Sequence, residues 1–193
     1  MKRVCVYCGS NFGKEPVYTE IAKELGGLLA ADGLELVYGG GNVGLMGTVA
    51  DAVIEAGGAV HGVIPQALEE KELAHRGVTE LTVVVSMHTR KQRMAELSDG
   101  FITLPGGIGT LEELAEIFTW LQLQFHNKPV GILNTNGYYD HLFAFLRHMR
   151  DEQFLKSRQL DALLVSNRPS ELLQQMREFT PCSDGKWFDN ARP

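Results

Sequence analysis

The chain has 193 residues, enough for one domain and short for two, and 44% of them are apolar, as in ordinary globular proteins. Its formal net charge of −6 argues against a non-specific nucleic-acid binder and against an anionic membrane surface as partner, because both favour a basic protein. The three cysteines do not make a secreted disulfide framework, and no stretch is apolar enough to span a membrane, so we expect a cytoplasmic protein.

Short apolar runs rich in β-branched residues alternate along the chain with longer amphipathic runs. The short runs predict strands at residues 3–8, 34–38, 59–64, 81–85, 101–105, 129–134 and 163–166. The amphipathic runs predict helices at residues 16–31, 48–55, 91–98, 111–125, 138–151 and 169–179.

Strands that are apolar throughout and alternate with helices indicate a mainly parallel sheet with helices on both faces. With right-handed crossovers, this pattern predicts a doubly wound, Rossmann-like α/β fold. We expect a single nucleotide-binding domain over residues 1–180, followed by a polar C-terminal tail over residues 181–193.

The 21 glycines of the chain cluster directly after three of the predicted strands. Gly9 and Ser10 follow the first strand, a glycine run over residues 39–47 follows the second, and another over residues 106–109 follows the fifth. In doubly wound sheets, ligands bind beyond the carboxyl ends of the strands, so these loops are the candidate site.

The run over residues 39–47 has the spacing of a dinucleotide-binding loop, but it does not follow the first strand. The acidic residue that should hold a ribose about 20 positions later is also missing. We interpret the segment either as a tight strand-to-helix turn or as a backbone wall of the site, in which Gly41 and Asn42 contact the ligand.

The loop over residues 105–110, Pro-Gly-Gly-Ile-Gly-Thr, leaves a buried strand and enters a helix. Its N–H groups and the helix dipole suit an anion, and the absence of a Walker lysine favours a monophosphate over a hydrolysable triphosphate. Thr110 can cap the helix or bind phosphate. Glu113 lies at capping-box spacing from Thr110, so the pattern alone predicts a capping role for it. The adjacent Glu112 is the competing candidate carboxylate.

Two adjacent cations, Arg90 and Lys91, follow the fourth predicted strand. They are either the solvated start of a helix or part of an anion site. Cations are disfavoured in a first helical turn unless an anion joins them, which favours the second reading.

These residues resemble the LONELY GUY (LOG) family of cytokinin riboside 5′-monophosphate phosphoribohydrolases. The resemblance is carried by P-G-G-x-G-T-x-x-E over residues 105–113 and by Arg-Lys 23 residues before the glutamate. The segments CVYCGS, VYGGGNVGLMG and KPVGILN…GYYD also resemble that family, so the likeness covers roughly residues 1–178.

The resemblance implies hydrolysis of the N-glycosidic bond of an N6-modified AMP, or of AMP itself, without metal or cofactor. It places the 5′-phosphate on the motif residues Gly106, Gly107, Gly109 and Thr110, and Ile108 fills the variable motif position. Glu113 and Arg90 become the catalytic pair. Further substrate contacts fall on Lys91, Glu72 and Thr119.

The chemistry of these residue types agrees with that activity. Departure of a purine leaves positive charge on the ribose, which a carboxylate near C1′ stabilises while it positions or deprotonates water. We assign this role to Glu113. Arginine is a poor general acid, so Arg90 is expected to bind phosphate or ribose and to orient Glu113.

Two alternatives remain open at this stage. Proteins of this type were long labelled lysine decarboxylases, in which the glycine loop would hold pyridoxal phosphate and Lys91 would form the Schiff base. The second alternative is a protein that binds a nucleotide without hydrolysing it.

The helix after the motif is unusually apolar, since six of the nine residues at 117–125 are apolar and Trp120 is among them. Such a helix is either a core helix or part of an interface, and the resemblance favours a homodimer. Cys5 and Cys8 should point to opposite faces of a strand, so they predict buried structural cysteines and no metal site.

Overall fold

A computed structural model describes residues 1–71 and 74–181 of the chain. Within these residues, seven parallel strands form one sheet in the order β4-β3-β2-β1-β5-β6-β7. The strands are β1 (Arg3–Tyr7), β2 (Glu35–Tyr38), β3 (Val60–Pro65), β4 (Glu80–Val84), β5 (Gly100–Thr103), β6 (Val130–Leu133) and β7 (Leu163–Ser166). All seven predicted strands are present, and the parallel doubly wound α/β fold is confirmed.

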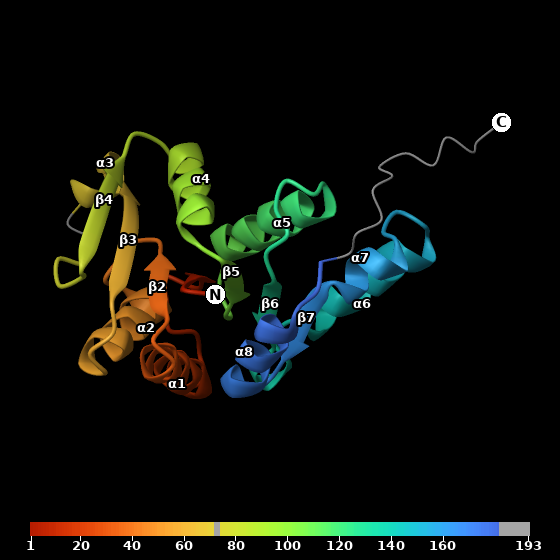
Figure 1. Cartoon of the computed structure of the whole chain (residues 1–193), viewed down its shortest axis with the longest axis horizontal. Coiled ribbons are helices and arrows are strands. Elements are labelled where there is room, and N and C mark those ends of the chain that lie inside the picture. Colours follow the sequence, from red (N-terminus) through yellow and green to blue (C-terminus); the bar gives the residue numbers. More distant parts are fainter. Residues whose placement is uncertain (72–73, 182–193) are drawn as a thin grey trace.

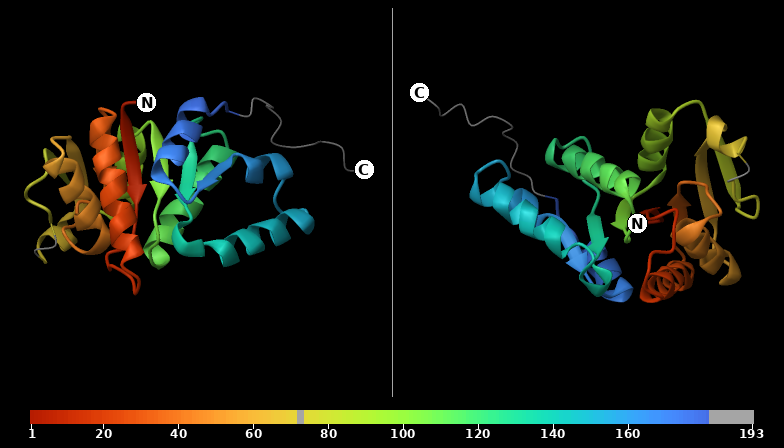
Figure 2. Two further views of the ribbon diagram at one scale, coloured as in Figure 1. Left: turned by 90° about the horizontal axis from the view of Figure 1, so that it is seen from below. Right: turned by 180° about the vertical axis from the view of Figure 1, so that it is seen from behind.

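The helices lie on both faces of this sheet (Figures 1 and 2). They are α1 (Val17–Ala31), α2 (Gly44–Glu55), α3 (Gln66–Glu69), α4 (Met87–Leu97), α5 (Ile108–Gln122), the 3₁₀ turn η1 (Thr135–Gly137), α6 (Asp140–Asp151), α7 (Ser157–Asp161) and α8 (Pro169–Glu178). In Figure 1, α4 and α5 lie on one face, whereas α1, α2 and α8 lie on the other. In the described residues, no helix combines the length and the apolar character needed to cross a membrane.

Successive side chains of β1 point to opposite faces of the sheet and so belong to two different core clusters. Val4 and Val6 join the cluster under α1, α2 and α8, whereas Cys5 and Tyr7 join the cluster under α4 and α5. Cys8 joins the first cluster, so Cys5 and Cys8 are buried on opposite faces, as their spacing predicts. Because both faces are covered, β1, β2 and β5 are buried along nearly their whole length and are mostly apolar.

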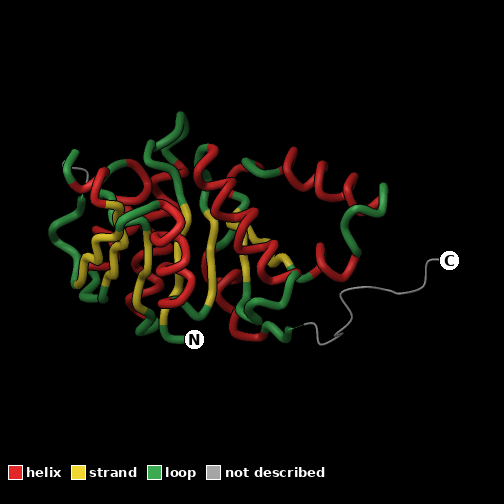
Figure 3. Tube along the Cα trace, turned by 90° about the horizontal axis from the view of Figure 1, so that it is seen from above, coloured by secondary structure: helices red, strands yellow, loops and turns green. Residues whose placement is uncertain are grey.

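The order in which strands are added to the sheet reverses between β1 and β5. The chain winds outward from β1 through β2 and β3 to β4, then returns to β5 beside β1 and continues to β6 and β7. The strands run side by side with loops at both ends (Figure 3), and the loops that follow β1 and β5 are hydrogen bonded, Gly9 N–H to Pro105 O at 3.1 Å. This junction is the topological switch point at which ligands bind in doubly wound sheets.

Several helix boundaries differ from the sequence prediction. α4 begins at Met87 instead of residue 91, because the Ser86 hydroxyl accepts a hydrogen bond from the Thr89 N–H and caps the helix there. α2 and α5 likewise begin inside their glycine runs, at Gly44 and Ile108. The sequence did not predict the short helices α3 and α7. Of the predicted tail over residues 181–193, all but Pro181 lies outside the described residues.

Candidate active site

The N-terminus of α5 presents unpaired backbone N–H groups at the switch point. Gly107 is the N-cap and supplies no side-chain cap, and the first helical hydrogen bond runs from the Leu111 N–H to the Gly107 carbonyl. The N–H groups of Ile108, Gly109 and Thr110 precede that bond and are therefore available to an anion.

The motif glycines serve two different purposes. A Cβ at Gly106 would lie 2.2 Å from the Thr110 Oγ1 and 2.8 Å from the Gly9 nitrogen, so packing requires glycine there. A Cβ at Gly107 or Gly109 would meet nothing within 4 Å, and neither residue has a positive φ. Their missing side chains instead keep the approach to the N–H groups open.

Glu113 does not cap α5, which overturns the capping-box interpretation. The helix begins before Thr110, so the Thr110 side chain is buried within its first turn and neither residue stands at a capping position. The Glu113 Oε1 accepts a hydrogen bond from the Arg90 Nη1 at 2.9 Å. Both side chains are about nine-tenths buried, at 10% and 9% exposure.

Arg90 connects α4 to α5 and to strand β3 of the sheet. Its Nε donates to the Val63 carbonyl of β3 at 3.1 Å, while Nη1 reaches Glu113. A Cβ at Gly39, which follows β2, would lie 1.8 Å from the Arg90 Nη2, so only glycine leaves room for the guanidinium. Gly39 and Val63 are site-building residues that the sequence did not single out.

The surroundings of Glu113 favour a basic carboxylate. Burial raises the pKa of Glu113, and the Arg90 guanidinium opposes part of that rise. A buried carboxylate whose pKa lies above its ordinary value can accept a proton from water, and its charge can stabilise a developing cation.

Lys91 points to α5 rather than to the glycine loop. Its Nζ donates to Glu112 and, at 3.1 Å, to the Glu116 Oε1, and the side chain is only 7% exposed. Burial disfavours the charged ammonium, but its hydrogen bonds to the Glu112 and Glu116 carboxylates outweigh burial and raise the pKa of Lys91.

A cavity of about 270 Å³ lies against the loops after β1 and β5. Gly9, Ser10, Gly106 and Gly107 line it together, as their positions after neighbouring strands predict. Its lining also includes Tyr138, a residue that the sequence analysis missed although it belongs to the GYYD segment.

Two neighbouring tyrosines support the backbone of the glycine loop. The Tyr138 hydroxyl donates to the Gly106 carbonyl at 2.6 Å, and the Tyr139 hydroxyl donates to the Leu104 carbonyl at 2.7 Å. These contacts join the start of α6 to the end of β5 and so hold the loop in place.

Other candidate residues lie apart from this constellation. Thr119 is exposed on α5, about 13 Å along the helix axis from Thr110, and donates to the Ala115 carbonyl. Gly41 pairs with Ala74, Asn42 is exposed, and neither lines the cavity. The Ile108 side chain is exposed to solvent, and Glu72 lies outside the described residues.

Comparison with known proteins agrees with this architecture. The model of the family described as "Possible lysine decarboxylase" matches residues 46–176. The chain is 47% identical to the cytokinin riboside 5′-monophosphate phosphoribohydrolase LOG5 of Arabidopsis thaliana over 184 residues, 95% of this chain and 81% of that protein. It is also 47% identical to a probable enzyme of the same name, LOGL2 of Oryza sativa subsp. japonica, over 93% of this chain and 74% of that protein.

Solved structures share the fold at lower identity. The molybdenum cofactor binding protein from Rippkaea orientalis has a TM-score of 0.69 at 24% identity, covering 92% of this chain and 97% of that one. The Moco carrier protein from Chlamydomonas reinhardtii has a TM-score of 0.67 at 22% identity, covering 92% and 96%. These two likenesses concern the fold alone, whereas the family model and the plant relatives show that the chain belongs to the LONELY GUY (LOG) family.

Proposed function

We propose that this protein hydrolyses the N-glycosidic bond of adenosine 5′-monophosphates, including N6-modified ones, to the free base and ribose 5-phosphate. The observation that carries the proposal is the buried Glu113–Arg90 pair, one turn inside the helix whose N-terminus is open to an anion. The activity named for the plant relatives, which cover nearly the whole chain, supports the same reaction.

In this reaction the 5′-phosphate occupies the N-terminus of α5, bound by the backbone at Gly106, Gly107 and Gly109 and by Thr110. Gly9 and Ser10, which line the adjoining cavity, complete its surroundings. Anchoring the phosphate there directs the ribose toward Glu113, which is 3 residues, about 4.5 Å of helix, beyond Thr110.

Glu113 stabilises the positive charge that develops on the ribose and accepts a proton from the attacking water. The water oxygen bonds to C1′ as the bond from C1′ to the purine nitrogen breaks, and the departing base takes up a proton. Arg90 holds the Glu113 carboxylate in place through its Nη1.

The paired state of Lys91 argues against the decarboxylase alternative. A Schiff-base lysine reacts as a neutral amine, whereas two carboxylates hold Lys91 as an ammonium and raise its pKa. The buried Glu113–Arg90 pair argues against the second alternative, because a carrier that only binds nucleotide does not require a carboxylate held in place by an arginine. Lys91, Glu72 and Thr119 remain candidate substrate contacts that mutation can test.

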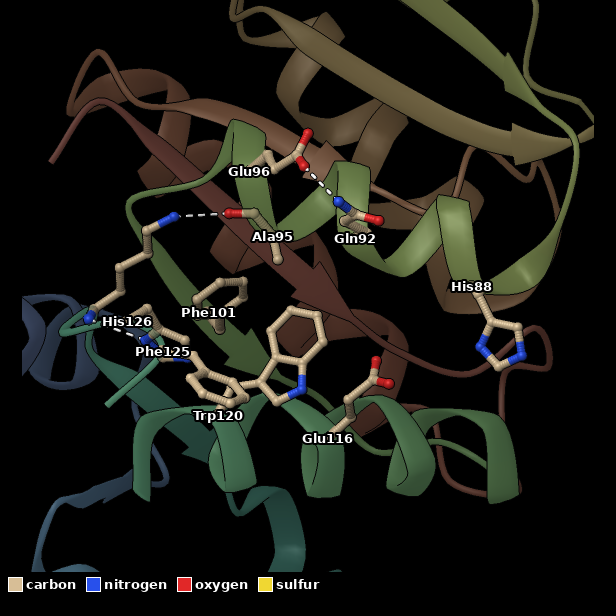
Figure 4. A pocket seen from close by; sticks show the side chains of 10 residues that line it. His88, Gln92, Ala95, Glu96, Phe101, Glu116, Trp120, Phe125 and His126 are labelled. Carbon is tan, nitrogen blue, oxygen red and sulfur yellow. Dashed lines mark hydrogen bonds between the residues drawn. The ribbon is translucent and has the colours of Figure 1, made fainter. Parts of the chain in front are cut away.

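We further propose that the protein is a cytoplasmic homodimer. A groove of about 490 Å³ between α4 and α5 is lined by the aromatic side chains of Phe101, Trp120 and Phe125 (Figure 4). Phe125 is 73% exposed in the single chain, and a two-fold partner would cover such a groove.

The test is product analysis after incubation with AMP and with isopentenyladenosine monophosphate, without added metal. Free base and ribose 5-phosphate are expected from the wild type.

Glu113→Gln should retain nucleotide binding and lose at least about 100-fold in kcat, because the neutral amide neither accepts a proton nor stabilises a cation. Tight binding without turnover would favour the carrier, and a pyridoxal chromophore with carbon dioxide released from lysine would favour the decarboxylase.

A further inference from the structure

The cations of α4 and the carboxylates of α5 form a double connection between the two helices. Arg90 pairs with Glu113, and the next residue, Lys91, pairs with both Glu112 and Glu116. Two consecutive residues of one helix thus engage three carboxylates within five residues of the other.

The Lys91 ammonium is already paired with carboxylates of α5. Its partners Glu112 and Glu116 lie two and six residues beyond Thr110, about 3 Å and 9 Å along the helix axis. Glu116 lines the groove between α4 and α5 (Figure 4). A buried ammonium with two carboxylate partners has little to gain from a third anion.

We propose that Lys91, Glu112 and Glu116 form an interhelical clamp that positions Arg90 and Glu113 for catalysis, and that Lys91 does not bind the substrate phosphate. Arg90 and Glu113 lie on different helices, so their alignment depends on the register of α4 against α5. The clamp fixes that register next to the pair. This inference rests on the proposed hydrolysis and assigns positioning roles within the same site.

Kinetics separate the clamp from a phosphate contact by the direction of the effect. If Lys91 bound phosphate, replacing both carboxylates by Glu112→Gln and Glu116→Gln would free the ammonium and leave KM unchanged or lower. If Lys91 is a clamp, that double variant and Lys91→Met should each lower kcat by about tenfold or more with little change in KM. Combining all three substitutions should cost little more than Lys91→Met alone, because all three remove the same interaction.

The dependence of kcat on pH provides a second measurement, because a purely structural role of Lys91 would not shift the acid limb of this profile. The charge of Lys91 lowers the pKa of Glu113, whereas that of Glu112 raises it. Lys91→Met should therefore shift the acid limb of kcat to higher pH, and Glu112→Gln should shift it to lower pH.

The other charged group that faces Glu113 is Arg90, which is hydrogen bonded to it. Burial raises the pKa of Cys5, Tyr7 and Cys8, so these three remain uncharged.

Thermal unfolding of every variant identifies loss of fold, and Lys91→Arg, which keeps the charge, should recover part of kcat. The matched control is Glu171→Gln, since Glu171 pairs with Arg168 three residues away and joins no second helix. Wild-type kcat in the Glu112→Gln/Glu116→Gln variant, or a raised KM for Lys91→Met at unchanged kcat, would overturn the clamp alone. A wild-type protein that leaves both nucleotides intact would overturn the proposed function together with the clamp.

Discussion

Three neighbouring residues fix the position of the Arg90 side chain. The Val63 carbonyl and the Glu113 carboxylate accept its hydrogen bonds, and Gly39 lies where any side chain would collide with it. A buried guanidinium held in this way loses little entropy when substrate binds, so it can direct Glu113 without rearrangement.

Gly39→Ala should therefore displace Arg90 and lower kcat/KM by about tenfold or more, although the substitution adds only a methyl group. Steady-state kinetics with AMP measure the effect, and thermal unfolding shows whether the fold persists. Unchanged kinetics in a folded variant would mean that catalysis does not require Arg90 at this position.

The glycine loop allows a matched comparison between neighbours. Gly107→Ala should fold normally, because its Cβ meets nothing, and should raise KM for the nucleotide because the methyl group obstructs the N–H groups. Gly106→Ala should instead lower the free energy of unfolding by about 1–3 kcal/mol, since its Cβ collides with Thr110 and Gly9. Chemical denaturation and KM, measured on both variants, should separate the packing role of Gly106 from the role of Gly107 in nucleotide binding. Equal changes in stability and in KM for the two variants would contradict this assignment.

At the scale of elements, α5 combines several tasks along its length. Its N-terminus faces the switch point, Glu113 reaches Arg90, and Glu112 and Glu116 hold Lys91. Further along, Phe118 and Leu121 pack into the core cluster beneath the helix. A change in the register of this helix would therefore move the proposed phosphate site and the Glu113–Arg90 pair together.

On the opposite face, α1 and α2 pack closely through a single glycine. A Cβ at Gly26 would lie 2.7 Å from the Ala52 Cβ and 2.8 Å from the Val49 carbonyl, whereas one at Gly27 would meet nothing within 4 Å. Gly26→Ala should lower the free energy of unfolding by about 1–3 kcal/mol. Gly27→Ala should raise it by about 0.5–1 kcal/mol, because alanine loses less backbone entropy in a helix.

Chemical denaturation of these two variants checks the packing of α1 on α2. Both substitutions are made in the interior of the same helix, so the difference between them reports tertiary contact rather than helix propensity. Equal stabilisation by both would show that the two helices do not approach as closely as described.

At the scale of the whole molecule, the order of the strands creates the site. The first paired residues of β1 and β5, Val4 and Gly100, are 96 residues apart, and seven of the described helices and strands lie between them in the sequence. Only their pairing at the switch point brings the loop after β1 to the glycine loop. The face carrying α4 and α5 leaves the aromatic groove uncovered in the single chain.

Size-exclusion chromatography with light scattering should give a mass of twice 21.3 kDa for the wild type. Phe125→Ser should weaken the association, because this side chain is 73% exposed at the groove. Phe154→Ser is the control, since Phe154 is 89% exposed beyond the end of α6 and does not line the groove. A wild-type mass near 21.3 kDa would contradict the dimer.

Much of the fold and part of the candidate site can be predicted from the sequence by itself. Apolar runs and their helical or alternating periods predict all seven strands and the parallel doubly wound sheet, because both faces of the central strands are buried. The glycine loops and Arg90 are also identifiable as candidate site residues, since they follow strands whose carboxyl ends meet at one edge of the sheet. The pattern alone predicts a capping role for Glu113, and only the resemblance to the LOG family places it in the catalytic pair.

Only the tertiary structure decides which partner each side chain takes. Glu113 pairs with Arg90, 23 residues away, instead of capping its own helix, and Lys91 turns to Glu112 and Glu116. The need for glycine at position 39 and the support from Tyr138 likewise arise from segments that are distant along the chain. Local patterns reflect backbone preference and burial, whereas a hydrogen bond or a steric contact depends on which elements the completed sheet brings together.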